Sequence, residues 1–432
     1  MVGACVGACL SVALVAAAQS LPPGNPGSKD AADGGSHAPG SLVDEIAGIV
    51  QARFYSPAWL EQVGWNAAVA RARREFAATD VPAERTAILR KLVATLKTSH
   101  TTYYPRSDPG YWFWTSLFEQ VLERVCPREQ TPGFPVARED IGVFWKQVEA
   151  DWFVGGVYVG GPADKAGLRP GDRILAADGQ PFSPVDSFAG RAGKPVSLQV
   201  QRARGAPAIA AVVTPQTTRP QEELRQATAD SWRIIEHHGH RIAYIHMWSW
   251  ATIEFQKVLL DAIAKSNTEG VDGFVLDIRD GWGGASGSFL GVFWKDVPLL
   301  ESVGRDGKRQ SFDQQVRKPA VLLVNGGTRS GKETIAYGAK KHRMARLIGE
   351  RTAGAYLGGG PSCLSDGSLL VIAMSEGRVD GERLEGRGVA PDIEVPFDFR
   401  YAAGADPQLD RALEVLSRQT PEKKKGVRPM SP

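Results

Sequence analysis

The chain has 432 residues, of which 43% are hydrophobic and 23% are charged, and its formal net charge is +3. This length allows two or three domains with a sizeable core, and the composition is ordinary for a globular protein. The small net charge argues against a nucleic-acid-binding protein. It gives no indication of a membrane-surface protein, although peripheral membrane association stays open.

The N-terminus has the pattern of an export signal. Residues 4–18 are almost wholly apolar and end in Ala16-Ala17-Ala18, which is typical of a cleavage site. We therefore expect residues 1–18 to be a secretory signal peptide and the protein to be exported, periplasmic or secreted. A buried N-terminal helix is the alternative, because the positively charged start of a signal peptide is missing. Residues 19–40 are rich in Pro, Gly and Ser and are expected to be a flexible linker.

Two cysteines, Cys126 and Cys363, lie outside the predicted signal peptide. In an oxidising compartment they could pair, but a sequence does not show whether two distant residues are close together. Two isolated thiols are the simpler expectation.

Residues 41–137 are predicted to form an N-terminal helical domain. Ser41 begins a capping-box pattern, and apolar residues recur on one face of the helix that follows. A second helix is expected after Pro82, and it ends just before Ser99 and His100. A histidine past a helix end and beside hydroxyl groups is a candidate general base, whereas a surface histidine is the simpler alternative.

Residues 138–215 form a distinct, β-rich module, and its signature stretch contains Gly-Gly-Pro-Ala and Pro-Gly-Asp. This stretch resembles a PDZ domain of the protease-associated type. PDZ domains bind an extended peptide end by strand addition, and a loop of backbone N–H groups receives the terminal carboxylate. A PDZ fold used only as a spacer is the alternative. The resemblance places the carboxylate loop at Ile141, Gly142, Val143 and Phe144.

Residues 216–417 alternate strands with helices, as expected for a mixed or parallel sheet covered by helices. A strand is predicted at 242–248, followed by a helix and a second strand at 271–278. Gly283 and Gly284 come after the second strand, where glycines let backbone N–H groups face a substrate. An ordinary glycine-rich turn is the alternative.

Ser330 stands on the turn between a predicted buried strand at 321–324 and a predicted helix at 333–342. A serine on such a turn is held forward, and backbone N–H groups converge there to stabilise an oxyanion, so Ser330 is the candidate nucleophile. One alternative is that Ser330 only caps the helix. Another is a phosphate-binding loop ending in Gly331-Lys332, which is disfavoured because Glu333 replaces the required Ser or Thr.

The order of these motifs resembles that of the C-terminal processing peptidases and the related tricorn protease core. The resemblance covers roughly residues 42–417. It implies a multidomain α/β fold whose catalytic core is of the ClpP/crotonase type, and an exported serine endopeptidase. The matching segments in chain order are Ser99-His100, the PDZ-like module, Leu276 to Gly284, Thr328 to Glu333, Arg346 to Thr352, Glu385 to Asp392 and Pro407 to Leu409.

In this family the nucleophile lies three residues before the glutamate that opens the helix, and this position is Ser330 here. Members with a Ser–Lys dyad carry a lysine soon after a Thr-x-Gly turn, but this chain has alanine there. The tricorn-like branch instead uses a histidine, which the pattern assigns to His100, with Ser99 and Glu385 orienting it. The resemblance implies an oxyanion hole built from the N–H of Gly331 and that of Gly283 or Gly284.

Two alternatives to this function stay open: a catalytically silent binding protein on the same scaffold, and a Ser–Lys peptidase with a displaced lysine. The implied partner is a protein or peptide substrate whose end the PDZ-like module binds, and no cofactor is implied. No metal site is expected, because His237, His238 and His240 have no carboxylates or thiols nearby. Residues 418–432 are predicted to be a disordered basic tail. The sequence does not determine the cleavage preference or the oligomeric state.

Overall fold

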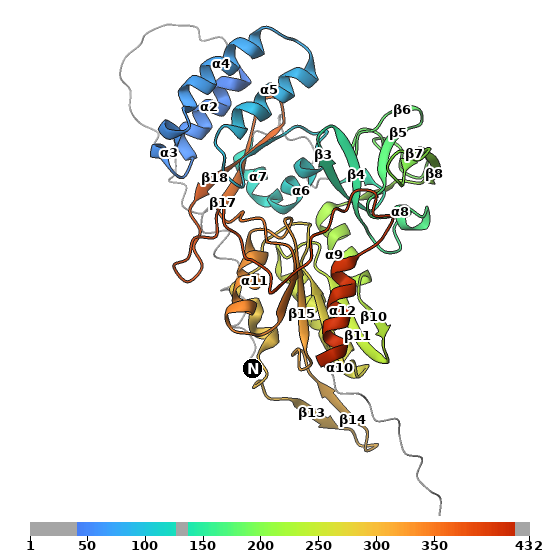
Figure 1. The fold of residues 1–432 in the computed structure, drawn as a ribbon. Coiled ribbons are helices and arrows are strands. Elements are labelled where there is room, and N and C mark those ends of the chain that lie inside the picture. Colours follow the sequence, from blue (N-terminus) through green and yellow to red (C-terminus); the bar gives the residue numbers. More distant parts are fainter. Residues whose placement is uncertain (1–40, 127–136, 420–432) are drawn as a thin grey trace, which may run out of the picture.

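The structure is a computed structural model that describes residues 41–126 and 137–419. The predicted signal peptide, the linker and residues 420–432 of the predicted tail lie outside these residues. The described chain consists of a group of helices near the N-terminus, a small β-rich module and a larger core (Figure 1). None of the helices in these two ranges has both the length and the apolar character needed to cross a membrane.

The N-terminal helical group begins as its capping residues predict. Ser41 caps the first helix through the expected capping box, in which its N–H donates to Asp44 Oδ2 at 3.2 Å. Two other helices start with proline, which fixes φ and loses no helical hydrogen bond at that position. The four helices are α2 (Leu42–Arg53), α3 (Pro57–Gln62), α4 (Trp65–Ala77) and α5 (Pro82–Ala94).

A three-stranded sheet fastens this helical group to the C-terminal half of the chain. β1 (Thr102–Tyr104) pairs antiparallel with β18 (Leu369–Ser375), which pairs with β17 (Gly358–Cys363). Leu370 of β18 is buried in the same apolar cluster as the inward faces of the helices. Because β1 begins two residues after His100, this pairing fixes where that histidine lies relative to the core.

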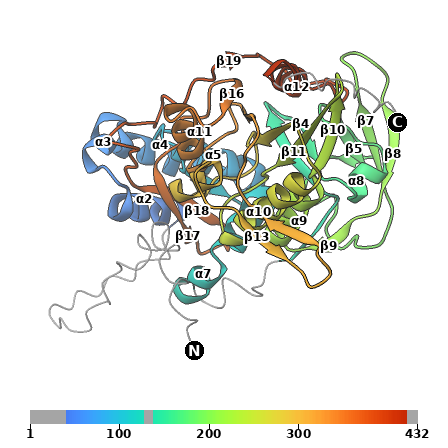
Figure 2. The ribbon, with the colours of Figure 1, turned by 90° about the horizontal axis from the view of Figure 1, so that it is seen from below.

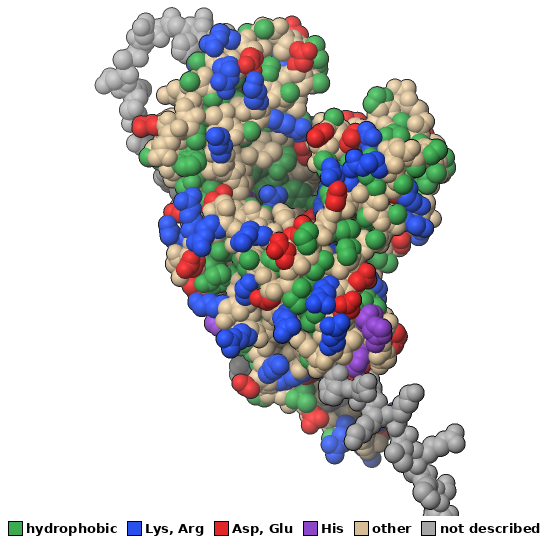
Figure 3. All heavy atoms as spheres, in the orientation of Figure 1, with side chains coloured by type: hydrophobic (Ala, Val, Ile, Leu, Met, Phe, Trp, Pro, Cys, Tyr) green, Lys and Arg blue, Asp and Glu red, His purple; other side chains and the backbone are tan. Residues whose placement is uncertain are grey.

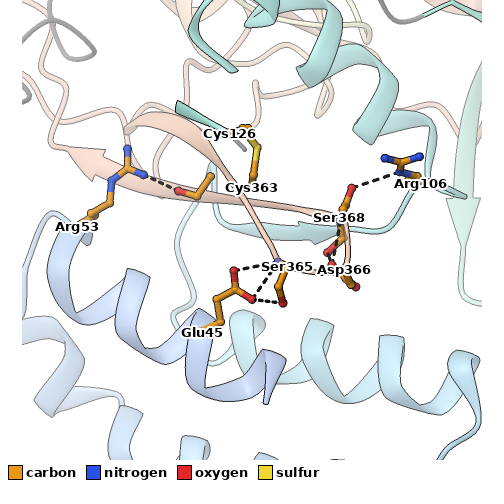
Figure 4. The surroundings of a disulfide bond; sticks show 10 residues. Glu45, Arg53, Arg106, Cys126, Cys363, Ser365, Asp366 and Ser368 are labelled. Atoms are coloured by element: carbon orange, nitrogen blue, oxygen red, sulfur yellow. Dashed lines mark hydrogen bonds between the residues drawn. A yellow bond between two sulfur atoms is a disulfide. The ribbon is translucent and has the colours of Figure 1, made fainter. Parts of the chain in front are cut away.

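Cys126 and Cys363 form a disulfide bond, with Cα atoms 5.8 Å apart (Figure 4). The bond joins the end of α7 (Glu119–Val125) to β17, so the expectation of two isolated thiols is wrong. Glu45 of α2 holds the same hairpin, because its carboxylate accepts from Ser365 N–H at 3.0 Å (Figure 4). The sequence could not show the pairing, since the cysteines are 237 residues apart.

The β-rich module is a sheet in the order β3-β4-β5-β7-β8, with β3 at one edge. The predicted alternation of β7 is confirmed, because Val196, Leu198 and Val200 are buried and the residues between them are exposed. The elements of the module are β2 (Arg138–Asp140), β3 (Val143–Val148), β4 (Asp151–Val157), α8 (Pro162–Lys165), β5 (Arg173–Ala177), β6 (Gln180–Pro181), β7 (Val196–Gln201), β8 (Ile209–Val213) and β9 (Gln216–Thr218).

The core contains a six-stranded sheet in the order β10-β11-β12-β15-β16-β19, parallel except for β10. The strands predicted before the glycines and before Ser330 are confirmed, with ends shifted by one or two residues. The six strands are β10 (Arg233–His237), β11 (His240–His246), β12 (Gly273–Asp277), β15 (Ala320–Val324), β16 (Arg346–Gly349) and β19 (Ile393–Glu394).

Helices cover both faces of the core sheet (Figure 2). α12 (Pro407–Gln419) packs on one face, and its range extends two residues into the predicted tail. The other face is covered by α9 (Pro220–Asp230), α10 (Ile253–Thr268) and α11 (Gly331–Lys341). Alternate side chains of β11, β12, β15 and β16 therefore enter two different apolar clusters, as expected for a sheet buried on both faces. The short helix η1 (Gly287–Phe293) and a hairpin of β13 (Leu300–Val303) and β14 (Arg309–Phe312) lie between β12 and β15.

Candidate active site

The candidate site lies where three parallel strands of the core sheet end. The loops after β12, β15 and β16 carry Gly283, Ser330 and Thr352, respectively. The carboxyl ends of neighbouring parallel strands meet at one edge of a sheet, which is where open α/β folds usually bind ligands. Residues from three separated sequence motifs are therefore brought to one place by the sheet.

Ser330 is the N-cap residue of α11 and has a φ of 57°, a left-handed backbone that few residues other than glycine adopt. Its N–H donates to Ala355 O at 3.0 Å. The position is thus that of a helix cap, as the simpler interpretation expected. A cap needs no such backbone, however, and residues held in this region cluster at functional sites.

Glu333 ties Ser330 to the turn that follows β16. Burial raises the pKa of Glu333, although the hydrogen bonds to its carboxylate oppose that rise. The carboxylate accepts from Ser330 N–H at 3.2 Å, Thr352 Oγ1 at 2.6 Å, Gly354 N–H at 2.8 Å and Ala355 N–H at 2.9 Å. These bonds join the start of α11 to the turn after β16 through a single carboxylate.

The glycines of the predicted oxyanion hole lie against Ser330 too closely for side chains. A Cβ atom at Gly283 would stand 2.5 Å from Ser330 Cβ and 3.2 Å from Ser330 Oγ. A Cβ atom at Gly331 would stand 2.3 Å from Ala285 N, and Gly284 has a φ of 106° that favours glycine. The loop after β12 and the start of α11 are therefore packed backbone to backbone.

Ser99, His100 and Glu385 are brought together from opposite ends of the chain. His100 Nδ1 lies 3.0 Å from Ser99 Oγ, which donates to Glu385 Oε2 at 2.8 Å. Because the single hydroxyl proton of Ser99 goes to Glu385, the hydroxyl oxygen accepts from Nδ1–H of His100. In the neutral imidazole this leaves Nε2 without a proton, which is the state a general base requires.

One short segment connects this group to Ser330. Tyr356 N–H and Leu357 N–H donate to Glu385 Oε2 at 2.7 and 3.2 Å. The residue before them, Ala355, accepts from Ser330 N–H. The Glu385 carboxylate, which binds Ser99 beside His100, is therefore also bound to the turn that contacts Ser330.

His100 lies in an environment that keeps its ring neutral. Burial lowers the pKa of His100 to about 4, and the nearby charge of Arg329 lowers it as well, whereas Glu385 opposes the shift. The ring of Trp114 stands edge-on to the imidazole, with ring centroids 6.5 Å apart. At neutral pH the imidazole can consequently accept a proton.

Lys332 is a buried cation beside Ser330 whose orientation the sequence did not reveal. Its side chain turns to the loop after β12, where Nζ donates to Asp280 O at 2.8 Å. Burial lowers the pKa of Lys332 to about 7, although the charges of Asp277 and Asp280 oppose the shift. A lone lysine has no pattern that signals burial, so sequence reasoning had no means of finding this.

Two stretches of the chain match known families. Residues 241–395 match peptidase family S41, and residues 153–202 match the PDZ domain. The chain carries an S41 peptidase domain and a PDZ domain. The resemblance that the order of motifs indicated is thereby confirmed, as is a fold of mixed helix and sheet with these two domains.

Curated relatives of the chain include a carboxyl-terminal-processing protease and a tricorn protease homolog. The carboxyl-terminal-processing protease of Synechocystis sp. is 28% identical over 278 residues, which are 60% of this chain and 63% of that protein. Tricorn protease homolog 1 of Streptomyces coelicolor is 29% identical over 263 residues, 57% of this chain and 24% of that protein. Each match covers less than two thirds of the relative's length.

The solved structure of the tricorn protease has a similar fold. It aligns with a TM-score of 0.51 and 17% identity, over 88% of this chain and 36% of that one. At this identity the likeness concerns the fold alone.

In the PDZ domain, the expected carboxylate loop is folded around a carboxylate of the chain itself. Asp140 Oδ1 accepts from Ile141 N–H at 2.6 Å and from Gly142 N–H at 2.9 Å. The two residues that follow, Val143 and Phe144, begin the edge strand β3. Sequence reasoning did not single out Asp140, because an acidic residue before such a loop is not visibly different from a surface residue.

The PDZ domain is docked on the S41 domain beside the candidate site. Lys146 of β3 forms an ion pair with Asp280 at 2.7 Å, and Asp280 O also accepts from Lys332. Phe144 packs against Trp248 of the S41 domain, with ring centroids 6.0 Å apart. The edge strand of the PDZ domain is therefore in contact with the loop that leads to Gly283.

A cavity of about 190 Å³ lies between the PDZ domain, α9 and α6 (Pro109–Leu117). Seven of its fifteen lining residues are aromatic, and Phe113 stacks on Trp282 with ring centroids 3.8 Å apart. Arg138 and Glu223 are among its polar lining residues. The molecular surface is hollowed between the helical group and the PDZ domain (Figure 3).

Proposed function

We propose that the chain is an exported serine endopeptidase that cleaves proteins or peptides with Ser330 as nucleophile and His100 as general base. One observation carries the proposal. Ser330 and Glu385 both bind the segment from Ala355 to Leu357, and Glu385 holds Ser99, which contacts the His100 ring. The membership of the core in peptidase family S41 supports the same activity.

The proposed reaction uses the two nitrogens of His100 differently. Nε2 takes the proton of the Ser330 hydroxyl while Oγ attacks the scissile carbonyl carbon. Nδ1 keeps its proton and donates it in a hydrogen bond to Ser99 Oγ, and Glu385 stabilises the imidazolium through that hydroxyl. The imidazolium then gives its Nε2 proton to the leaving amine, and water hydrolyses the acyl-enzyme by the same route.

The oxyanion of the tetrahedral intermediate would be stabilised by backbone N–H groups. Gly331 N–H opens α11 and benefits from the positive end of the helix dipole. Gly283 or Gly284 supplies the second donor, and the approach of Gly283 to Ser330 Oγ supports the assignment of this loop.

Lys332 is the competing base, and it corresponds to the displaced lysine of the Ser–Lys alternative. Two observations support Lys332 as the base. It is buried beside Ser330, and burial lowers its pKa to about 7, close to the pH at which such a base would work. Its ammonium, however, donates to Asp280 O. We assign it the role of holding the loop after β12, and His100 remains the proposed base.

The alternative of a silent binding protein is disfavoured by the candidate catalytic residues. A protein that only binds has no need of the strained Ser330 backbone or of the hydrogen-bonded group of Ser99, His100 and Glu385. Hydrolysis of a denatured protein by the purified chain tests the proposal. We expect Ser330→Ala to abolish cleavage and Ser302→Ala, on the exposed β13–β14 hairpin, to leave it unchanged. Absence of cleavage by the unsubstituted chain would favour the binding protein.

Export is supported by two features. Residues 4–18 have the apolar pattern of a signal peptide, and a disulfide bond persists in oxidising compartments such as the periplasm. N-terminal sequencing of the exported protein is expected to begin at Gln19. An intact Met1 on protein confined to the cytosol would rule the idea out.

A further inference from the structure

The carboxylate loop of the PDZ domain raises the question of what it can still bind. A loop of this kind recognises a peptide end because its N–H groups donate to the terminal carboxylate. Two of these donors, Ile141 N–H and Gly142 N–H, already donate to Asp140 Oδ1 at 2.6 and 2.9 Å. Asp140 therefore occupies the place that a ligand carboxylate would take.

Asp140 is held firmly in this position. Its side chain is buried, with 2% of the residue exposed, and its other oxygen, Oδ2, forms an ion pair with Arg138 Nη2. Arg138 is itself only 9% exposed. Among the described residues, Arg138 Nε and Nη1 have no hydrogen-bond partner, so Asp140 is its principal counter-charge. Moving Asp140 away from the loop would leave a buried guanidinium without that partner.

The surroundings also disfavour a second negative charge. Glu223 of α9 lines the cavity beside Arg138. Burial, and next the charge of Asp140, hold the pKa of Glu223 well above its usual range, and Arg138 only partly offsets this. A peptide carboxylate entering the loop would meet the same desolvation and the same repulsion from Asp140.

The strand that follows the loop lies at an edge of its sheet. β3 stands at the edge of the PDZ sheet and pairs with β4 alone among the strands that the structure describes. An edge strand adds a further strand through backbone hydrogen bonds, which require an extended segment but no chain end. Lys146 pairs with Asp280 and Phe144 packs on Trp248, so this strand lies beside the loop after β12, which contacts Ser330.

We infer that Asp140 replaces the terminal carboxylate of a ligand, so that the PDZ domain of this chain takes extended internal segments of unfolded polypeptides rather than free carboxyl termini. This inference deepens the proposed function and rests on it for the fate of the bound segment. It narrows the substrate class. A substrate segment would be selected for its extended backbone, and a free carboxyl end would give the substrate no advantage in binding.

The experiment compares three forms of one fluorescent, valine- and alanine-rich octapeptide: the free acid, the amide, and a form extended by two residues. Binding to the full chain carrying Ser330→Ala is measured by fluorescence anisotropy, so that no peptide is cleaved. We expect the three dissociation constants to agree within about threefold. A free acid that binds roughly tenfold or more tightly than the amide would overturn the inference, as would a failure of all three forms to bind.

Variants of the loop test the role of Asp140 directly. Asp140→Ala empties the loop and frees Arg138, so the free acid is expected to gain roughly tenfold or more over the amide. Asp140→Asn keeps an acceptor for the loop and removes the charge, which guards against a misfolded alanine variant, and a smaller gain is expected. Asp164→Ala is the matched control, because Asp164 is an exposed carboxylate of the same domain that accepts from Gly160 N–H at 2.8 Å.

The outcomes separate this inference from the proposed peptidase activity. An unchanged preference in both Asp140 variants would show that Asp140 does not control end recognition, whatever the activity of the chain. An active peptidase that prefers free termini would overturn the inference and leave the proposed function intact. A chain that binds all three peptides alike but cleaves nothing would sustain the inference and overturn the proposed function.

Discussion

Ser99 donates both its backbone N–H and its hydroxyl to Glu385, at 2.9 and 2.8 Å, across a separation of 286 residues. This double contact fixes the residue before His100 to the carboxylate that also binds the turn next to Ser330. Two segments from opposite ends of the chain thereby share one polar group. In the proposed mechanism Glu385 is a positioning residue for the imidazole, because it contacts Ser99 and acts through it.

The first prediction concerns this positioning. All four groups that bind the Glu385 carboxylate are donors, so the NH₂ group of a glutamine would face donors and lose hydrogen bonds. Glu385→Gln is expected to lower kcat by roughly 10²-fold, less than the loss from Ser330→Ala. Steady-state kinetics on a fluorogenic peptide measures this, and Glu382→Gln on the exposed neighbouring loop serves as the control. An unchanged kcat in Glu385→Gln would remove Glu385 from the mechanism.

The second prediction separates His100 from Lys332 as the base. His100→Ala is expected to lower kcat by roughly 10³-fold or more. Lys332→Met keeps the volume of the wholly buried side chain and loses only the hydrogen bond to Asp280 O, so it is expected to lower kcat much less than His100→Ala. An alanine at this position would leave a cavity and confuse the result with unfolding. Activity that survives in His100→Ala but disappears in a folded Lys332→Met would restore the Ser–Lys mechanism.

The third prediction is the pH dependence of kcat/KM. Burial lowers the pKa of His100 to about 4, so the imidazole stays neutral and able to accept a proton well below its ordinary pKa. The acid limb of the profile is therefore expected to lie near pH 4 to 5, below the ~6.5 of an unperturbed histidine. Because Lys332 has a pKa of about 7, a limb near neutral pH would indicate the lysine instead.

The same shift has a consequence for folding. The folded chain resists protonation of His100 until about pH 4, whereas the unfolded chain binds that proton below the usual pKa of 6.5. The unfolded state thus binds more protons between these two values, and the contribution of His100 to the free energy of unfolding falls as the pH falls through this window. His100→Gln is expected to flatten this part of the pH dependence in denaturant unfolding.

The fourth prediction concerns the close approach of Gly283 to Ser330. A Cβ atom at Gly283 would stand 2.5 Å from Ser330 Cβ and 2.8 Å from Arg329 O, so the loop after β12 must shift. Gly283→Ala is expected to reduce kcat by about 10²-fold, since a displaced oxyanion donor costs that much. Gly291→Ala is the control, because a Cβ atom there meets nothing within 4 Å. Equal activity of the two variants would exclude this loop from the oxyanion hole.

The fifth prediction concerns the disulfide bond between α7 and β17. Removal of Cys126 and Cys363 together, by serine substitution, is expected to lower the free energy of unfolding by about 2–4 kcal/mol, because the bond closes a long loop. Thermal unfolding with and without a reductant measures this. The reductant is expected to lower the Tm of the unsubstituted chain and to leave the doubly substituted chain unchanged. A Tm that does not respond to the reductant in either protein would contradict the prediction.

The sequence by itself determined the elements near the nucleophile. The apolar run at 321–324, the turn residues after it and the helical spacing from Glu333 predicted β15 and α11, and the structure confirms both. Their patterns are local, because a strand before a glycine-rich turn and an amphipathic helix are specified within about ten residues. The order of motifs likewise indicated the S41 and PDZ domains, because each motif contains residues that a backbone turn or a close contact between backbone segments requires.

Only the tertiary structure decided which distant groups meet. The disulfide of Cys126 with Cys363 and the burial of Lys332 each depend on how separate segments pack, and the contact of Ser99 with Glu385 was expected from the resemblance alone. Asp140 is an example at short range. The sequence shows its neighbours, but only the structure shows that its carboxylate turns to Ile141 N–H. Periodicity and turn chemistry report on local backbone, whereas burial and the pairing of polar groups are properties of the packed chain, and a sequence without its fold does not contain them in readable form.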